Sequence, residues 1–423
     1  MSSTALLVVL LALAYIGSLV VGSRGQRGYG LTSGVEYLLV GVALGPHLLG
    51  LVDRDLARGF GPLAVVGLGW VGFGAGLEYG MSGRRRITAR GAVVGVALGL
   101  VGVAFVGAAV WLSLLWLAGL GLATPPAREA LLLAGGVGAV GAETARHVIR
   151  AVVERDRAEG RLTNLLADLA AADDVIPVLA LTALYAFAPA GAADGLSLAT
   201  RIGLELGLGV LLGLLLAALL GREPRLAESW GLLLGTCLLA LGVASRLELS
   251  ALAVAFFFGL SLAIGSRHRD DLRDMVTPTE QPVVLPLLLL AGASIDVRAA
   301  PYLVPAIAVG IVARVVVKLL AGAGVLLVSL RARAAGLRVG LGLLPSGAFG
   351  VAIGMSCYVA LPGGVGETIL AFSALSCVVG ELLGPPAVRR TLVAAGEIAG
   401  APPAASPPGR AEPPAAVTPE GGA

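Results

Sequence analysis

Apolar residues run through this chain in long stretches that short polar connections separate, and most of the stretches are 17 residues or longer. Since an α-helix rises 1.5 Å per residue, such lengths match the ~30 Å hydrocarbon core of a bilayer. The pattern therefore predicts thirteen transmembrane helices, at 4–22, 33–51, 61–79, 91–119, 128–149, 162–188, 198–220, 230–245, 249–265, 282–296, 302–328, 337–360 and 365–388.

The composition supports an all-α integral membrane protein. The chain is 57% hydrophobic and only 13% charged, and its apolar stretches do not break into the short alternating segments of a membrane β-barrel. Sixty-two glycines suit helices that pack closely in lipid. The apolar run 5–21 follows Met-Ser-Ser-Thr with no basic residue, so we expect a spanning helix there rather than a signal peptide.

Arginine placement predicts the orientation in the cytoplasmic (inner) membrane. One alternate set of connections, together with the C-terminal flank, holds about 20 basic residues against about 6 in the other set. We therefore expect the N-terminus outside and the C-terminus in the cytoplasm. Beyond Ala401 the Pro/Ala/Gly-rich chain reads as a disordered tail, too short for a nucleotide-binding regulatory domain.

Other partner classes have no support in the sequence. The net charge of +3 is spread over the loops without a basic arm, which argues against a nucleic-acid partner. Cys237, Cys357 and Cys377 are odd in number and lie in apolar runs, so neither a disulfide framework nor a metal site is expected. We expect no cofactor.

Thirteen helices divide into six, one and six, and an odd middle helix inverts the second half. In transporters built from such inverted repeats, the site lies at the midplane between Gly- or Pro-interrupted helices. The fifth stretch of each half fits this description: 128–149 is rich in glycine, and 337–360 contains Pro345. We expect both to be broken helices, with Thr144 and Ser346 as hydroxyl ligands; ordinary close packing through glycine is the alternative.

Two adjacent carboxylates, Asp173 and Asp174, lie near the middle of the apolar stretch 162–188. Asp173 is roughly 16 Å along the helix from Leu162, about half the hydrocarbon thickness. A carboxylate at that depth costs about 2.5 to 3.5 kcal/mol on insertion scales. This cost predicts an ion site, although a structural ion pair between helices is the alternative.

Lys318 is the only lysine of the chain and lies in the apolar stretch 302–328. Snorkelling to the interface would need a reach of ~15 Å, which exceeds a lysine side chain. We therefore expect Lys318 to be the charge partner of the aspartates. Arg314, one helical turn earlier, is the alternative partner of Asp173.

These residues carry a resemblance to a known family. Five segments are similar to motifs of the monovalent cation:proton antiporters, in particular the paired-aspartate branch with thirteen helices. They are Ala170–Ile176 with its Asp-Asp pair, Leu285–Asp296, Ala313–Lys318, the Gly340–Pro345 start of a broken helix, and Tyr37–Gly50. Glu143 stands where that branch usually has a small or hydroxyl residue, and Arg146 and His147 follow it. Glu143 is therefore a further candidate ligand.

The resemblance implies a homodimer in which two broken helices cross in a moving core. Asp174 would bind a cation or a proton in alternation, and Asp173 would pair with Lys318. The implied parts are scaffold and dimerisation helices at 1–90 and 229–300, core helices at 91–190 and 301–392, a linker helix at 191–228 and a disordered Pro/Ala-rich tail at 393–423.

The function expected from these residues is exchange of Na⁺ or K⁺ for H⁺, which is transport and not enzyme catalysis. Two other functions stay open: a transport-inactive sensor or scaffold of transporter-like fold, and a Na⁺-coupled symporter of an organic anion. Two midplane carboxylates repel an anion, which disfavours the symporter.

Overall fold

The structure is a computed structural model that describes residues 34–46, 48–52, 59–79, 81–82, 85–187, 197–221, 226–296, 300–328, 335–361 and 363–398. Apart from a hairpin of two-residue strands, β1 (Met81–Ser82) and β2 (Arg85–Arg86), the regular structure in these ranges is helical. The predicted all-helical fold is therefore confirmed. The predicted first helix, 4–22, lies outside the described residues.

The helices follow the apolar stretches of the sequence. They are α2 (Val35–Leu44), α4 (Gly61–Glu78), α5 (Ala89–Gly119), α6 (Ala127–Ala142), α7 (Arg146–Asp156), α8 (Arg161–Ala172), α9 (Val175–Phe187), α10 (Leu198–Leu220), α11 (Leu226–Arg246), α12 (Ala251–Gly265), α13 (Arg269–Ala293), α14 (Leu303–Val328), the 3₁₀ helix η2 (Gly336–Leu343), α15 (Ala348–Ala360) and α16 (Gly363–Ala394). Within the described residues, eight spans are long and apolar enough to cross a membrane, and nine if the bent pair η2–α15 counts as one.

Helix α13 begins well before the predicted segment 282–296. Its first half is polar and contains Pro278, so hydropathy alone does not detect it. The helix nevertheless continues through this half because Leu272 and Val276 are buried in an apolar cluster with α4 and α12.

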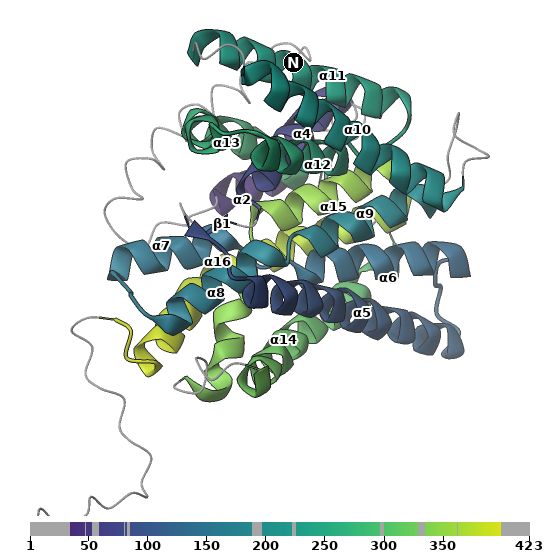
Figure 1. The fold of residues 1–423 in the computed structure, drawn as a ribbon. Helices are drawn as coiled ribbons and strands as arrows, with labels where there is room; N and C mark the ends of the chain where they lie inside the picture. Colours follow the sequence, from purple (N-terminus) through teal and green to yellow (C-terminus); the bar gives the residue numbers. More distant parts are fainter. Residues whose placement is uncertain are drawn as a thin grey trace, which may run out of the picture.

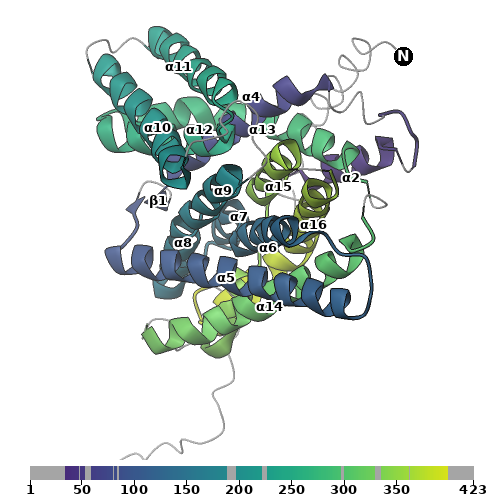
Figure 2. The same cartoon turned by 90° about the vertical axis from the view of Figure 1, so that its right-hand side faces the viewer.

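The helices form two groups that face each other (Figures 1 and 2). The first group contains α2, α4, α10, α11, α12 and α13, with close pairs α4–α12, α10–α12 and α2–α13. The second group contains α5 to α9, α14, η2, α15 and α16, with close pairs α5–α6, α15–α16 and α14–η2. Helices α15 and α9 touch both groups, since α15 also packs on α4 and α13 and α9 on α10 and α12.

Glycines allow the closest helix crossings. At the crossing of α2 and α13, a Cβ on Gly41 would collide with the carbonyl oxygen of Leu289, and a Cβ on Gly292 with that of Leu38. Backbones that approach this closely gain van der Waals contact, which drives helix association where lipid removes the hydrophobic effect between helices. The high glycine content of the sequence is used here for packing.

The C-terminal end of α16 is tied to the start of α8. The Glu397 carboxylate accepts hydrogen bonds from the backbone N–H groups of Leu162 and Thr163, each at 2.7 Å, and from the Thr163 hydroxyl at 2.8 Å. Ile398 is buried beside them. The sequence assigned residues 393–398 to a disordered tail; the structure corrects that boundary, because this capping carboxylate orders them.

Candidate functional site

Two helix breaks lie against each other inside the second group. Helix α6 ends at Ala142 and α7 begins at Arg146, while η2 ends at Leu343 and α15 begins at Ala348 with a bend of 50° between the two. The Ala145 N–H donates to the carbonyl oxygen of Pro345 at 3.1 Å, which joins the two breaks. Pro345 cannot donate a helical hydrogen bond, which explains one interruption locally.

Arg314 of α14 occupies the space between the breaks. Its guanidinium donates to the carbonyl oxygens of Gly141 (2.8 Å), Glu143 (2.9 Å) and Pro345 (3.0 Å), and to those of Val140 and Leu344 at 3.3 Å. Helix C-termini carry a partial negative charge and unpaired carbonyls, so a buried arginine with five donors matches this position. Its resolved hydrogen bonds all go to the backbone, which indicates a structural task.

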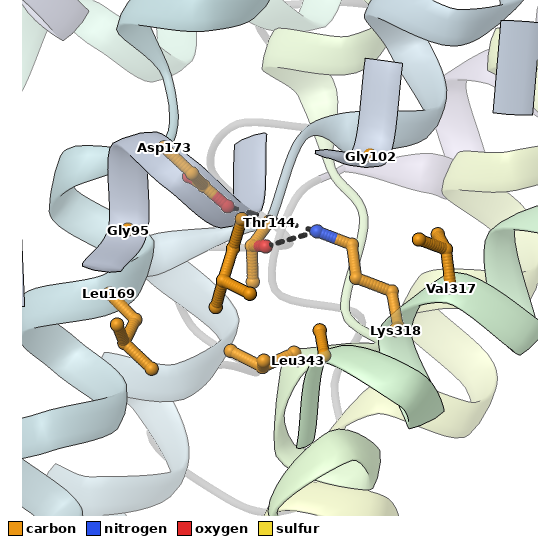
Figure 3. A pocket seen from close by; sticks show the side chains of 10 residues that line it. Gly95, Gly102, Thr144, Leu169, Asp173, Val317, Lys318 and Leu343 are labelled. Atoms are coloured by element: carbon orange, nitrogen blue, oxygen red, sulfur yellow. Dashed lines mark hydrogen bonds and ion pairs between the residues drawn. The ribbon is translucent and has the colours of Figure 1, made fainter. Parts of the chain in front are cut away.

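Lys318 lies one turn further along α14 and is 7% exposed. Its ammonium donates to the carbonyl oxygen of Ala142 at 2.6 Å and to the Thr144 hydroxyl at 2.7 Å, and it is 3.8 Å from Oδ2 of Asp173. Figure 3 shows the amine pointing at Thr144, with Asp173 on the other side of that threonine. The amine thus joins the first break to the aspartate pair.

The two aspartates sit between α8 and α9 and face different surroundings. Asp173, 4% exposed, lines a cavity of about 10 Å³ together with Thr144 and Lys318, and its Oδ1 has no hydrogen-bond partner among the described residues. That volume is close to the minimum for a single water molecule. An oxygen left unpaired in such a place is a position for a water or an ion.

Asp174, 2% exposed, faces a larger cavity and an arginine. Its Oδ2 is 3.0 Å from Nε of Arg146, the first residue of α7. Both side chains line a cavity of about 270 Å³ that also contacts Glu78 of α4 and Glu280 of α13. The cavity therefore lies between the two helix groups and reaches Asp174 directly.

Glu143 links the two breaks through its side chain. Its Oε2 accepts hydrogen bonds from the Ser346 hydroxyl at 2.9 Å and from the Gly347 N–H at 3.4 Å. This places a carboxylate beside the N-terminus of α15, where the helix dipole favours negative charge. Glu143 is 1% exposed and also lines the 270 Å³ cavity.

The structure thus brings all seven candidate residues of the sequence to one place: Glu143, Thr144, Asp173, Asp174, Arg314, Lys318 and Ser346. Arg146 was not among them, and it makes the shortest ion pair of either aspartate. The sequence signal was available, since a charged residue three positions after Glu143 in an apolar stretch is a functional candidate in itself. His147, 3.2 Å from the buried Glu381 of α16, is a second neighbouring pair that the sequence did not predict.

The charges of this cluster limit what it can do. When all of its groups are ionised, the cluster has three negative and three positive side chains, which balance: Asp173, Asp174 and Glu143 against Arg146, Arg314 and Lys318. An unbalanced buried charge is costly. An added cation is therefore stabilised only if a proton or another positive group leaves the acidic side chains. Competition between cations for one buried carboxylate is the chemistry that this arrangement provides.

Broken helices that meet around buried carboxylates in an apolar helix bundle are typical of secondary transporters. The family described as "Sodium/hydrogen exchanger, transmembrane" matches residues 8–389. The chain belongs to this family and is a multi-pass membrane transport protein of the antiporter type.

Solved structures share the fold. The sodium proton antiporter MjNhaP1 from Methanocaldococcus jannaschii at pH 8 is 18% identical, with a TM-score of 0.70 over 94% of this chain and 100% of that one. An electron-microscopy structure of the same antiporter gives 17% identity and a TM-score of 0.65 over 92% and 97% of the two chains. A comparison with curated proteins finds no match.

Proposed function

We propose that this protein exchanges a monovalent cation, Na⁺ or K⁺, for H⁺ across the cytoplasmic membrane, and that Asp174 carries both ions in alternation. The observation that carries the proposal is the position of Asp174, a nearly fully buried carboxylate that lines the 270 Å³ cavity between the helix groups. Family membership supports cation:proton antiport as the reaction class.

Asp174 suits the carrier role better than Asp173 because of what each one touches. The cavity gives ions from solution a route to Asp174, whereas Asp173 faces Lys318 and a space of about 10 Å³. We assign Asp173 to electrostatic balance of Lys318 and to a shared water or ion, with Thr144 as the hydroxyl between them.

Antiport follows from mutual exclusion at one carboxylate. A proton or a metal cation can each discharge Asp174, and the two together would put one more positive charge into a low-dielectric site than either alone. The transported ion is a substrate, and a proton that replaces it leaves the net charge of the cluster unchanged. Coupling is tight when the carrier crosses poorly with Asp174 ionised and empty.

Alternating access would be motion of the second helix group against the first. On this proposal α2, α4 and α11 to α13 form a static scaffold that also provides the dimer contact, α10 is the linker, and the group with the two breaks moves. The 270 Å³ cavity lies on the boundary between these groups. Glu78 and Glu280, which line the cavity, lie at the arginine-containing connections after 61–79 and 249–265. With the orientation that the arginines predict, the cavity is then on the cytoplasmic side of Asp174.

Exchange measured in proteoliposomes tests the proposal. Purified protein is reconstituted with a pH-sensitive dye inside, and external Na⁺, K⁺ or Li⁺ is added against a choline control. We expect a cation-dependent pH change that Asp174→Asn abolishes and that Glu154→Gln, at an exposed position, preserves. Exchange by Asp174→Asn at the parent rate would contradict the assignment, and a folded parent with no signal for any cation would favour a transport-inactive role.

A further inference from the structure

Arg146 carries a positive charge at a position where the electrostatics of its own helix disfavour one. It is the first residue of α7, and the N-terminus of a helix has a partial positive charge that repels an arginine. Its position is explained by Asp174, whose Oδ2 is 3.0 Å away. The arginine therefore occupies the carboxylate that a transported cation would need.

A second candidate carboxylate partner for Arg146 lies across the cavity. Glu78 and Glu280 belong to α4 and α13 of the first helix group, line the same cavity and interact electrostatically with Arg146. Glu78 is already 2.9 Å from Nε of Arg273. Glu280 forms no hydrogen bond or ion pair with any residue in the ranges that the structure describes, so it is the open acceptor.

The exposure of the pair is uneven, which permits such a movement. The Asp174 side chain is 3% exposed, whereas the Arg146 side chain, which lines the same cavity, is 21% exposed. Because Arg146 and Glu280 line the same cavity, rotation of the long arginine side chain is the movement that would bring the two together. Asp174 has no comparable freedom.

We infer that Arg146 is a tethered competitor of the transported cation at Asp174, and that it moves to Glu280 when a cation binds. This inference rests on the proposed role of Asp174 as the cation site. Since the arginine stays charged at any physiological pH, it lowers cation affinity by occupancy. Glu280 reduces this effect because it stabilises the displaced arginine.

Na⁺ affinity of the purified protein tests the inference without transport. The affinity is obtained from the Na⁺ dependence of the unfolding temperature at alkaline pH, with choline chloride holding the ionic strength constant. Arg146→Gln should tighten Na⁺ binding by about fivefold, since the binding-competent fraction rises. Arg146→Lys, which keeps a cation at the position, should retain most of the weaker affinity of the parent.

Glu280→Gln separates competition from a general field effect. In the parent, Glu280→Gln should weaken Na⁺ binding about two- to threefold, because Arg146 loses its second carboxylate partner. In the Arg146→Gln background it should have no effect. Equal weakening in both backgrounds would overturn the inference, and so would an Arg146→Gln variant that binds Na⁺ no more tightly than the parent. If Arg146→Gln does not fold, comparison of the parent with Glu280→Gln still tests the inference. Equal Na⁺ affinity of these two proteins would contradict the role of Glu280 as the second partner of Arg146.

Failure of the inference is distinguishable from failure of the proposed function. A parent that exchanges ions, with no gain of affinity in Arg146→Gln, overturns the inference alone. A parent that binds Na⁺ more weakly than Arg146→Gln but exchanges nothing in proteoliposomes supports the inference and contradicts antiport. Absence of Na⁺ binding in every variant overturns the inference.

Discussion

Arg314 on α14 donates a 2.9 Å hydrogen bond to the backbone carbonyl oxygen of Glu143, and the same nitrogen lies 3.0 Å from the carbonyl of Pro345. One side chain thus satisfies backbone groups of both broken helices. In lipid no water is present to do so, and unpaired carbonyls cost several kcal/mol each. The breaks that open space around the aspartates therefore depend on this arginine.

Arg314→Lys should destabilise the protein strongly even though it keeps the charge. An ammonium has three donors in place of five and cannot span both breaks, so at least two buried carbonyls lose their partner, at about 3 kcal/mol or more in total. Thermal unfolding in detergent measures the loss. Arg150→Lys is the matched control, because its exposed pair with Glu154 contributes less than about 1 kcal/mol; equal unfolding temperatures for both variants would argue against this role of Arg314.

Lys318→Met should also lower the unfolding temperature. The substitution removes the donor to the carbonyl of Ala142 and to the Thr144 hydroxyl, at a cost of roughly 3 kcal/mol, and deprives Asp173 of its nearest cation. Adding Asp173→Asn to Lys318→Met should then restore part of the stability. Strictly additive losses in the double variant would mean that the 3.8 Å pair carries no coupling.

Gly292→Ala tests the close crossing of α2 and α13. The added methyl group meets the carbonyl oxygen of Leu38, so the helices must separate, and we expect a loss of about 1 to 3 kcal/mol. At Gly207 in α10, no atom of the described residues outside its own helix backbone lies within 4 Å of a new Cβ. Gly207→Ala should instead be neutral or slightly stabilising. Thermal unfolding of the two variants side by side gives the sign of each effect.

Glu397→Ala should weaken the attachment of the C-terminal end of α16 to α8. The carboxylate caps the N–H groups of Leu162 and Thr163, and loss of such a cap costs about 1 to 2 kcal/mol. Hydrogen exchange at the start of α8 should rise in the variant, with little change in α12. Unaltered protection of Leu162 and Thr163 would contradict the contact.

Hydropathy was sufficient for most of the fold because lipid-spanning helices are long and apolar. It failed at the first half of α13, where buried Leu272 and Val276 hold a polar helix that no apolar average detects. The interruption expected in 337–360 lies at residues 344–347, where Pro345 acts locally and is readable from sequence. The one expected in 128–149 lies at residues 143–145, after the glycines, which are inside helix α6 and pack against α5 and other helices.

The sequence shows which charged residues are buried in the membrane region, but it does not show which of them form ion pairs. The sequence located Asp174 and Lys318 by the cost of burying them, but it gave no means of choosing partners across helices. The ion pair of Arg146 with Asp174 and the carbonyl contacts of Arg314 depend on how two breaks meet in space. Such contacts between distant segments follow from tertiary packing alone.

Proton release on cation binding tests the central claim most directly. Purified protein in weakly buffered detergent solution, brought to a pH at which Asp174 holds a proton, is mixed with Na⁺ or K⁺ while the pH is recorded, with choline as the control. The proposed mechanism predicts proton release that saturates with cation concentration, decreases as the starting pH rises and is absent in Asp174→Asn. Equal release by parent and Asp174→Asn would show that another group exchanges the proton and would contradict the account.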